Sequence, residues 1–153
     1  MQIIALGFNW SEVRKRTSSQ QIVDEMIHTD DIDIYTSDVP RGVWRSDSAS
    51  QHFQTAEALS NERKANPDDN ALSHVASLIA NGDSIDELGL SPLTDGVYFI
   101  TISPERVAAL LPSFSSYVER AKLPDYAIEW VRQWEAALRF ANSEGLGILC
   151  SCG

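Results

Sequence analysis

The chain has 153 residues, 43% hydrophobic and 22% charged, which is ordinary for a globular protein of one domain. We therefore expect a single globular domain over residues 1–153, with a core large enough to form without disulfide bonds. Lys and Arg number 12 against 22 Asp and Glu, a formal net charge of -10. This charge disfavours nucleic acid and anionic membrane surfaces as partners. Two interpretations stay open: the charge attracts a cationic protein, or it serves solubility alone.

Cysteine usage and the lack of a long apolar run indicate the compartment. Cys150 and Cys152 are the two cysteines, and a disulfide between residues two apart on one strand would be strained. The absence of a disulfide framework is typical of a reducing cytosol. We find no secretory leader at residues 1–10 and no apolar stretch of the roughly 20 residues that cross a bilayer. The sequence therefore predicts a soluble, cytoplasmic protein.

The N-terminal third predicts one strand, one helix and a long loop. Residues 2–8 are apolar and partly β-branched, which is typical of a buried strand. A capping signal at Asn9 predicts a helix that reaches about residue 28, and the polar stretch 14–19 is a candidate interruption with a restart capped at Thr17 or Ser18. Residues 32–35 alternate and are a candidate strand, whereas the serine-, proline- and glycine-containing stretch 36–50 predicts a loop.

Two helices are expected in the middle of the chain. Residues 49–64 predict a weakly amphipathic helix whose apolar contacts are Phe53, Ala56 and Leu59. Asn66 as the cap and Pro67 at the first helical position predict the start of the next helix. Its inward-facing residues are expected to be Leu72, Val75, Ala76, Leu78 and Ile79.

Residues 97–102 form the clearest predicted strand, because they are almost continuously apolar, β-branched or aromatic. Ser103 and Pro104 then predict a helix start, since serine caps a helix and proline fits its first turn. A proline within a helix removes a backbone hydrogen bond, so we expect Pro112 to end this helix. Residues 114–122 predict a separate short helix.

The strongest predicted helix is 124–142, which is expected to carry an ion pair between Glu135 and Arg139 and to be closed by Gly145. Residues 146–150 then predict the last strand. The apolar stripe of the helix comprises Ala127, Trp130, Val131, Trp134, Leu138 and Ala141.

Few strands among many helices indicate an α+β fold. We expect a small, mostly antiparallel sheet of three to four strands with several helices packed on it. The sequence contains no internal repeat and no low-complexity tract.

No catalytic, metal or cofactor motif is present in the sequence. The three histidines, His28, His52 and His74, lie outside any known nucleophile or metal pattern. The Cys150–Cys152 pair has no second cysteine pair that could complete a zinc site. We therefore predict no catalytic residue, no metal and no cofactor, and the expectation is that the chain is not an enzyme.

Carboxylates gather near the end of the first predicted helix, where Asp30, Asp31 and Asp33 lie within four positions. A calcium loop would need more oxygen ligands in a fixed register and a closing glutamate, which is missing. The two interpretations left open are an electrostatic docking patch for a partner and a solvated helix end. In the first, the patch also includes Asp24, Glu25 and Asp38.

Trp44 is the remaining candidate for partner binding. It lies in the predicted loop between Arg41 and Arg45, and tryptophan and arginine are the residue types that dominate interface hot spots. The alternative is that Trp44 packs into the core where the loop crosses it. The sequence does not decide between these two roles.

In size, acidity and α+β make-up the whole chain resembles bacterial immunity proteins of polymorphic or contact-dependent toxins. No family motif accompanies the resemblance, so no functional residue is carried over from it. The resemblance implies an inhibitor that binds one cationic toxin domain tightly and occludes or distorts its site. The alternatives are an enzyme whose site is assembled from scattered residues, for instance a hydrolase using Asp31 or His52, and a structural or interaction subunit.

Overall fold

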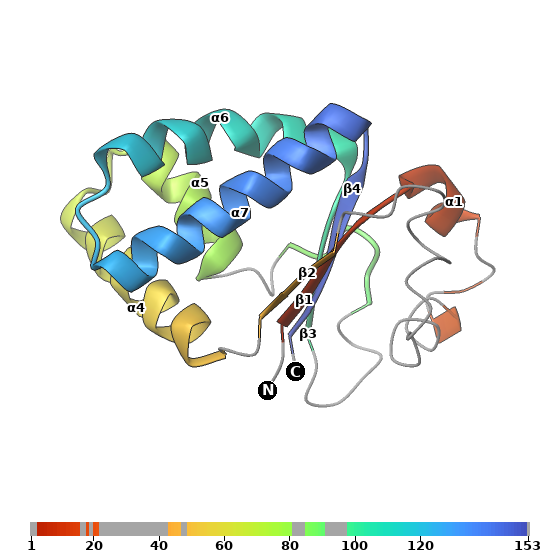
Figure 1. Cartoon of the computed structure of the whole chain (residues 1–153), viewed down its shortest axis with the longest axis horizontal. Helices are drawn as coiled ribbons and strands as arrows, with labels where there is room; N and C mark the ends of the chain where they lie inside the picture. Colours follow the sequence, from red (N-terminus) through yellow and green to blue (C-terminus); the bar gives the residue numbers. More distant parts are fainter. Residues whose placement is uncertain are drawn as a thin grey trace.

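The computed structural model describes residues 3–15, 18, 20–21, 43–46, 49–80, 85–90 and 98–152. The fold is α+β, as predicted: long helices gather on one side of a small antiparallel sheet (Figure 1). The short helix α1 (Trp10–Arg14) lies on the other side of that sheet. The sheet is therefore a layer between a large helical body and a smaller covering element.

The sheet contains four strands in the spatial order β2-β1-β4-β3, and all neighbours are antiparallel. The central pair is β1 (Ile3–Phe8) and β4 (Gly147–Cys152), in a register that places Ala5 opposite Cys150. The strands next to them are β3 (Tyr98–Ile102) beside β4 and β2 (Val43–Ser46) beside β1. The three strands expected at 2–8, 97–102 and 146–150 are confirmed.

Both faces of the sheet are buried, which explains why β3 and β4 are apolar at successive positions rather than at alternate ones. Towards the long helices lie Ile100, Ile102, Ile148 and Cys150, all within the main core. On the opposite face lie Phe99 and Leu149, which belong to a second, smaller cluster. That cluster is completed by Phe8, Val13 and Leu90.

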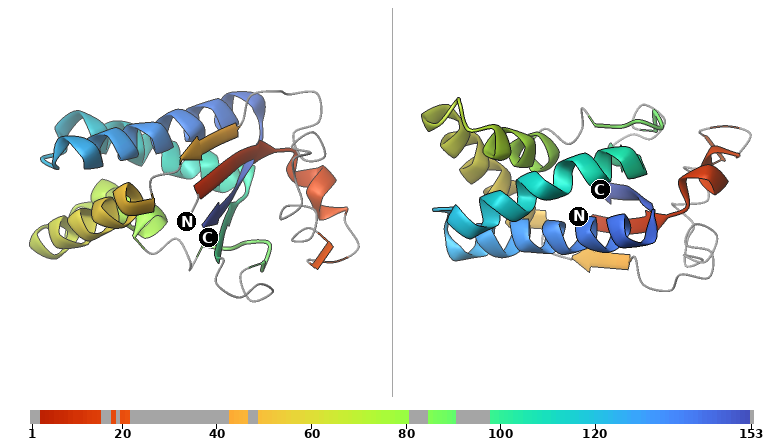
Figure 2. Two further views of the ribbon diagram at one scale, coloured as in Figure 1. Left: turned by 60° about the horizontal axis from the view of Figure 1, so that its bottom comes forward. Right: turned by 90° about the horizontal axis from the view of Figure 1, so that it is seen from above.

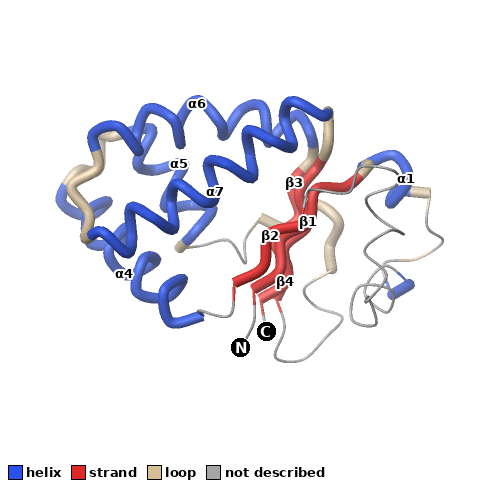
Figure 3. The backbone as a smooth tube through the Cα atoms, viewed as in Figure 1, coloured by secondary structure: helices blue, strands red, loops and turns tan. Residues whose placement is uncertain are grey.

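Four long helices form the helical body: α4 (Ala49–Ala65), α5 (Asn70–Ile79), α6 (Pro104–Arg120) and α7 (Asp125–Glu144). Figure 2 shows α6 and α7 running side by side, with the α4–α5 pair next to them. Both α6 and α7 also contact β4, and α7 contacts β1. Helices α6 and α7 therefore join the helical body to the two central strands (Figure 3).

Helix α7 confirms the prediction made for residues 124–142. All six residues of its expected stripe are buried, and the side chains of Trp130 and Trp134 are fully covered. Gly145 adopts the left-handed conformation, with φ 67°, that ends a helix, and glycine adopts it without a steric penalty. Arg139 and Glu135 form the expected ion pair, with 2.6 Å between Nη2 and Oε1.

Of the three apolar contacts expected for α4, Leu59 is buried and Ala56 packs against the main core, but Phe53 does neither. Phe53 is 47% exposed, whereas His52, Thr55 and Leu59 are buried. The Thr55 hydroxyl is satisfied inside its own helix, because it donates to the Gln51 carbonyl at 2.7 Å. Two of the buried positions of α4 are thus occupied by polar residues, His52 and Thr55. The prediction depended on apolar residues alone, so it did not identify this face.

Helix α5 begins three residues later than predicted. Asp69, not Asn66, is the cap, and its carboxylate accepts a hydrogen bond from the Leu72 amide at 3.1 Å. Asn66 instead ends α4, where its side chain donates to the Glu62 carbonyl at 3.0 Å. Pro67 follows in the turn between the two helices. The five inward-facing residues predicted for this helix are all buried.

Pro112 does not end α6, which continues to Arg120, so the prediction of two helices is wrong. Proline inside a helix costs about 3 kcal/mol, because it removes a backbone donor and crowds the preceding turn. The residues beyond it offset that cost, since Phe114 and Tyr117 continue the buried stripe begun by Val107 and Leu110. Ser103 caps the helix as expected, accepting from the Arg106 amide at 3.3 Å.

The loop predicted for 36–50 contains two regular segments. Residues 43–46 form the edge strand β2, and α4 starts at Ala49. The candidate strand at 32–35 lies outside the described residues, as do residues 22–28 of the helix expected from Asn9. The first part of that helix is α1, where the Val13 amide donates to the Asn9 carbonyl at 3.2 Å. It ends at Arg14, so the helix is interrupted in the polar stretch 14–19, and the Ser18 hydroxyl accepts from the Gln21 amide at 3.2 Å, as expected for a restart capped there.

Gly147, the first residue of β4, lies where the structure leaves no room for a side chain. A Cβ atom there would lie 2.7 Å from Cε3 of Trp10 and 2.8 Å from the carbonyl oxygen of Ile102. The Trp10 ring is held in that position by stacking on Phe8, with 5.5 Å between the ring centroids. Glycine at 147 thus lets α1 approach the central strand.

We expect Gly147→Ala to lower the free energy of unfolding by about 2 to 3 kcal/mol, because backbone and indole atoms must both move. The control is Gly145→Ala, where a Cβ meets nothing within 4 Å and only the positive φ is unfavourable, at about 1 kcal/mol. Urea denaturation of both variants measures the difference. Equal losses would contradict the packing described for Trp10.

Candidate functional site

The acidic residues predicted to bind a partner are Asp30, Asp31, Asp33 and Asp38, and they lie outside the described residues. Their role in docking therefore stays a prediction. The sequence around them sharpens it: residues 24–38 contain six carboxylates and neither lysine nor arginine. We call residues 24–38 the acidic segment.

Trp44, the other predicted binding residue, belongs to strand β2, where it is opposite Ala5 of β1. The backbone of Trp44 is thus fixed by the sheet, although the sequence predicted a loop. Within the described residues β2 pairs with β1 alone, so it is an edge strand (Figure 3). An edge strand presents unpaired backbone groups, which natural proteins use for partner contacts or cover by other means.

His52, considered above as a catalytic residue, lies between α4 and α7 and is only 2% exposed. Its ring meets the Trp130 ring edge-on, with 5.7 Å between the centroids. Burial lowers the pKa of His52 to about 4, so the imidazole is neutral at neutral pH. A neutral imidazole shielded from solvent fits a packing role, and its position does not support a role in proton transfer to a substrate.

His74 makes a cross-helix contact that sequence reasoning missed. Its Nδ1 lies 2.8 Å from the hydroxyl oxygen of Ser113, which links α5 to α6. In the described part of the chain, neither side chain contacts a carboxylate that could orient the imidazole for catalysis. The third histidine, His28, lies outside the described residues.

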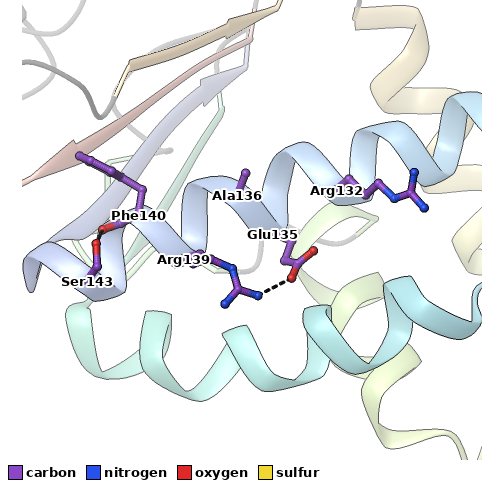
Figure 4. Close-up of a pocket in the computed structure, with 6 residues that line it drawn as sticks. All are labelled: Arg132, Glu135, Ala136, Arg139, Phe140 and Ser143. Atoms are coloured by element: carbon purple, nitrogen blue, oxygen red, sulfur yellow. Dashed lines mark hydrogen bonds and ion pairs between the residues drawn. The ribbon is translucent and has the colours of Figure 1, made fainter.

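A shallow groove of about 360 Å³ runs along α7 (Figure 4). Arg139 pairs with Glu135 one turn away on α7 (Figure 4). Ser115 of α6 donates to the same carboxylate at 3.0 Å. The guanidinium of Arg139 also donates to the Ser115 hydroxyl. This network satisfies most of the polar groups in the groove and leaves Arg132 as its unpaired charge within the described residues.

Two further ion pairs join distant parts of the fold. Arg120 donates two hydrogen bonds of 2.6 Å to Asp69, which lower the pKa of that carboxyl, and its guanidinium lies 5.4 Å from the centroid of the Tyr117 ring. Burial raises the pKa of Glu87, but hydrogen bonds from the Ser103 amide and from Arg106 outweigh it and hold the pKa below its ordinary value. Both carboxylates are thus engaged in holding helix ends.

An exposed aromatic and acidic surface lies where α4 meets α7. Phe53 and Tyr126 are the large hydrophobic residues that remain exposed in the described part of the chain, at 47% and 41%. They lie on elements that touch, because the Gln51 side chain donates to the Tyr126 carbonyl at 3.0 Å. Nearby on the same helices are Glu57, Asp125 and Glu129, which are exposed and make no ion pair within the described residues.

We call Phe53, Glu57, Asp125, Tyr126 and Glu129 the α4–α7 surface. Sequence reasoning placed Phe53 in the core and did not consider Tyr126. One signal in the sequence could have identified them as exposed: the charged residues nearest to each of the two aromatic residues in the chain are carboxylates. Aromatic side chains exposed among carboxylates are suited to binding a protein that carries basic residues around an apolar depression.

Nothing among the described residues forms a metal centre, because no group of three or more His, Cys, Asp or Glu side chains comes together there. Cys150 is fully buried in the main core, opposite Ala5 and Ile100 in the sheet. It acts there as a small apolar residue. No helix in the described part of the chain is long and apolar enough to span a membrane.

Comparison with known proteins found no matching family model, no matching curated protein and no matching solved structure.

Burial of His52 should make folding sensitive to pH. The unfolded chain takes up a proton near pH 6.5, but the folded chain does so only near pH 4. The titration of His52 therefore has no effect on the free energy of unfolding above about pH 6.5. As the pH falls towards 4 it lowers that free energy, by about 3 kcal/mol in total.

His52→Leu should remove this part of the pH dependence, because leucine does not titrate. Chemical denaturation of both proteins at pH 7, 6, 5 and 4.5 measures the effect. The stability difference between the variant and the parent chain should shift in favour of the variant as the pH falls. A difference that is constant over this range would show that His52 is not buried as described.

Proposed function

We propose that this chain is a cytoplasmic binding protein that neutralises a cationic toxin domain, in the manner of a bacterial immunity protein. The proposal follows from the excess of ten negative charges and from the described histidines, which have packing or cross-helix roles. Long-range attraction would bring a basic partner to such a surface, and exposed aromatic side chains would then anchor it.

The observation that carries the proposal is the position of the acidic segment in the chain. Residues 24–38 contain six carboxylates, and five residues, 39–43, separate them from Trp44 of edge strand β2. Carboxylates and a tryptophan within one stretch of the chain combine steering with an anchor. The edge strand holds the backbone of the anchor, which lowers the entropy that binding must overcome.

The α4–α7 surface supports the same proposal independently. It offers two exposed aromatic side chains and three exposed carboxylates that make no ion pair within the described residues. Exposed apolar side chains scattered singly are ordinary, but an aromatic pair on touching helices in an acidic setting is typical of a binding surface.

The runner-up function is a hydrolase, and the contact between His74 and Ser113 is the observation that favours it. A serine within hydrogen-bond reach of a histidine is the first requirement for nucleophilic catalysis. Ser113→Ala would abolish such an activity. Inhibition by binding is favoured over it because the pair joins two packed helices and has no carboxylate partner within the described residues.

The test uses an affinity-captured partner from the native host, purified and measured by surface plasmon resonance at low and high salt. We expect the triple change Asp30→Asn, Asp31→Asn and Asp33→Asn to slow association about tenfold at low salt, with little change in dissociation. Trp44→Ala should instead speed dissociation about tenfold or more, because anchor residues act after encounter.

A matched control removes the same three charges elsewhere. Glu105→Gln, Glu119→Gln and Glu144→Gln change exposed residues that make no ion pair within the described chain. This triple should leave association within about twofold of the parent rate. If both triples slow association equally, the binding is not localised at the acidic segment, and if neither does, the proposal is wrong.

A further inference from the structure

A second cavity, with a basic lining and open to solvent, lies where α4 turns into α5. Its volume is about 460 Å³, and it is lined by Ser60, Arg63, Lys64, Pro67 and Ser73. No carboxylate is among these lining residues, although the chain has 22 carboxylates against 12 basic residues. The lining of this pocket is therefore positively charged in a protein whose net charge is negative.

The lining residues form a coherent set of donors. Ser60, Arg63 and Lys64 are spaced i, i+3 and i+4, which places them on one face of the last turns of α4. Ser73 belongs to the first turns of α5, across the turn that contains Pro67. Two cationic groups and two hydroxyls thus converge from two helices on one space.

These donors are not used by the fold. Arg63 and Lys64 form no ion pair or side-chain hydrogen bond within the described residues, and neither do the hydroxyls of Ser60 and Ser73. Basic residues at the end of a helix complement its dipole. That role accounts for the charge of Arg63 and Lys64, but it explains neither the cavity nor the two free hydroxyls beside it.

Two carboxylates near the cavity are engaged elsewhere. Asp69 accepts two hydrogen bonds from Arg120 and one from the Leu72 amide. Glu62 accepts from the Asn66 side chain at 3.4 Å. Asp68, beside Pro67, is exposed and makes no ion pair within the described residues. None of the three lines the cavity, and none is paired with Arg63 or Lys64.

We propose that this cavity between α4 and α5 binds a phosphate group, either free phosphate or the phosphate of a small monoester. Phosphate carries up to two negative charges at neutral pH and most of its oxygens accept hydrogen bonds, which match a set of donors with two cations. Arg63 would bind two oxygens with its planar guanidinium, and Lys64 would act as a point charge. The hydroxyls of Ser60 and Ser73 would complete the shell.

The test titrates ¹⁵N-labelled full-length chain with inorganic phosphate, and separately with phenyl phosphate, at constant ionic strength held by NaCl. We expect saturable amide shifts confined to residues 60–73. Arg63→Gln and Lys64→Gln should each raise the Kd about tenfold, and the double variant should abolish binding. The probe that binds more tightly identifies the source of the phosphate.

The matched control is Arg132→Gln, which removes one exposed and unpaired cation from the α7 groove. This variant should keep the parent Kd for both probes. Retention of binding by the double variant, loss of binding in Arg132→Gln, or shifts no larger than those caused by NaCl would each overturn the proposal. The spectra of the variants without phosphate show whether they are folded.

Discussion

The burial of the apolar stripe of α7 is the interaction on which the rest of the structure depends. Trp130 and Trp134 are fully covered, and the helix that carries them touches α4, α6, β1 and β4. Burying each indole contributes several kcal/mol before the loss of conformational entropy is counted. His52 of α4 is buried with its ring edge-on to Trp130, and that burial keeps the imidazole neutral. The stripe of α7 therefore sets the protonation state of a residue on another helix.

Much of this fold could be predicted from the sequence, and the reason is visible in particular residues. The stripe of α7, the Gly145 terminus and the apolar run of β3 are local patterns whose periodicity and chemistry agree with the final structure. The prediction failed where distant contacts decided. Helix α6 continues through Pro112 because Phe114 and Tyr117 pack on neighbouring helices. Residues 43–46 form a strand through their antiparallel pairing with β1, a contact between segments that are distant in the sequence.

The candidate sites were harder to predict, for a related reason. The net charge suggested a cationic partner, and the acidic segment is visible in the sequence because its six carboxylates lie within one continuous stretch, 24–38. The α4–α7 surface and the phosphate cavity each combine residues from two helices, so no single stretch of sequence displays them. Exposure also cannot be read from residue type, as Phe53 shows: an aromatic residue at helical spacing is usually buried, and this one is not.

The order of the strands in space has a consequence for how the protein folds. The first strand in the chain, β1, and the third, β3, do not pair with each other, and β4 lies between them in the sheet. Contacts among α4, α5, α6 and α7 join segments that are closer in the chain than those joined by the contact between β1 and β4. Because contacts between distant segments are slow to form, the helical body is expected to assemble first. The open sheet would then be completed by β4 acting as its closing strand, and until that step β1 and β3 would expose unpaired edges on which chaperones or other chains could act.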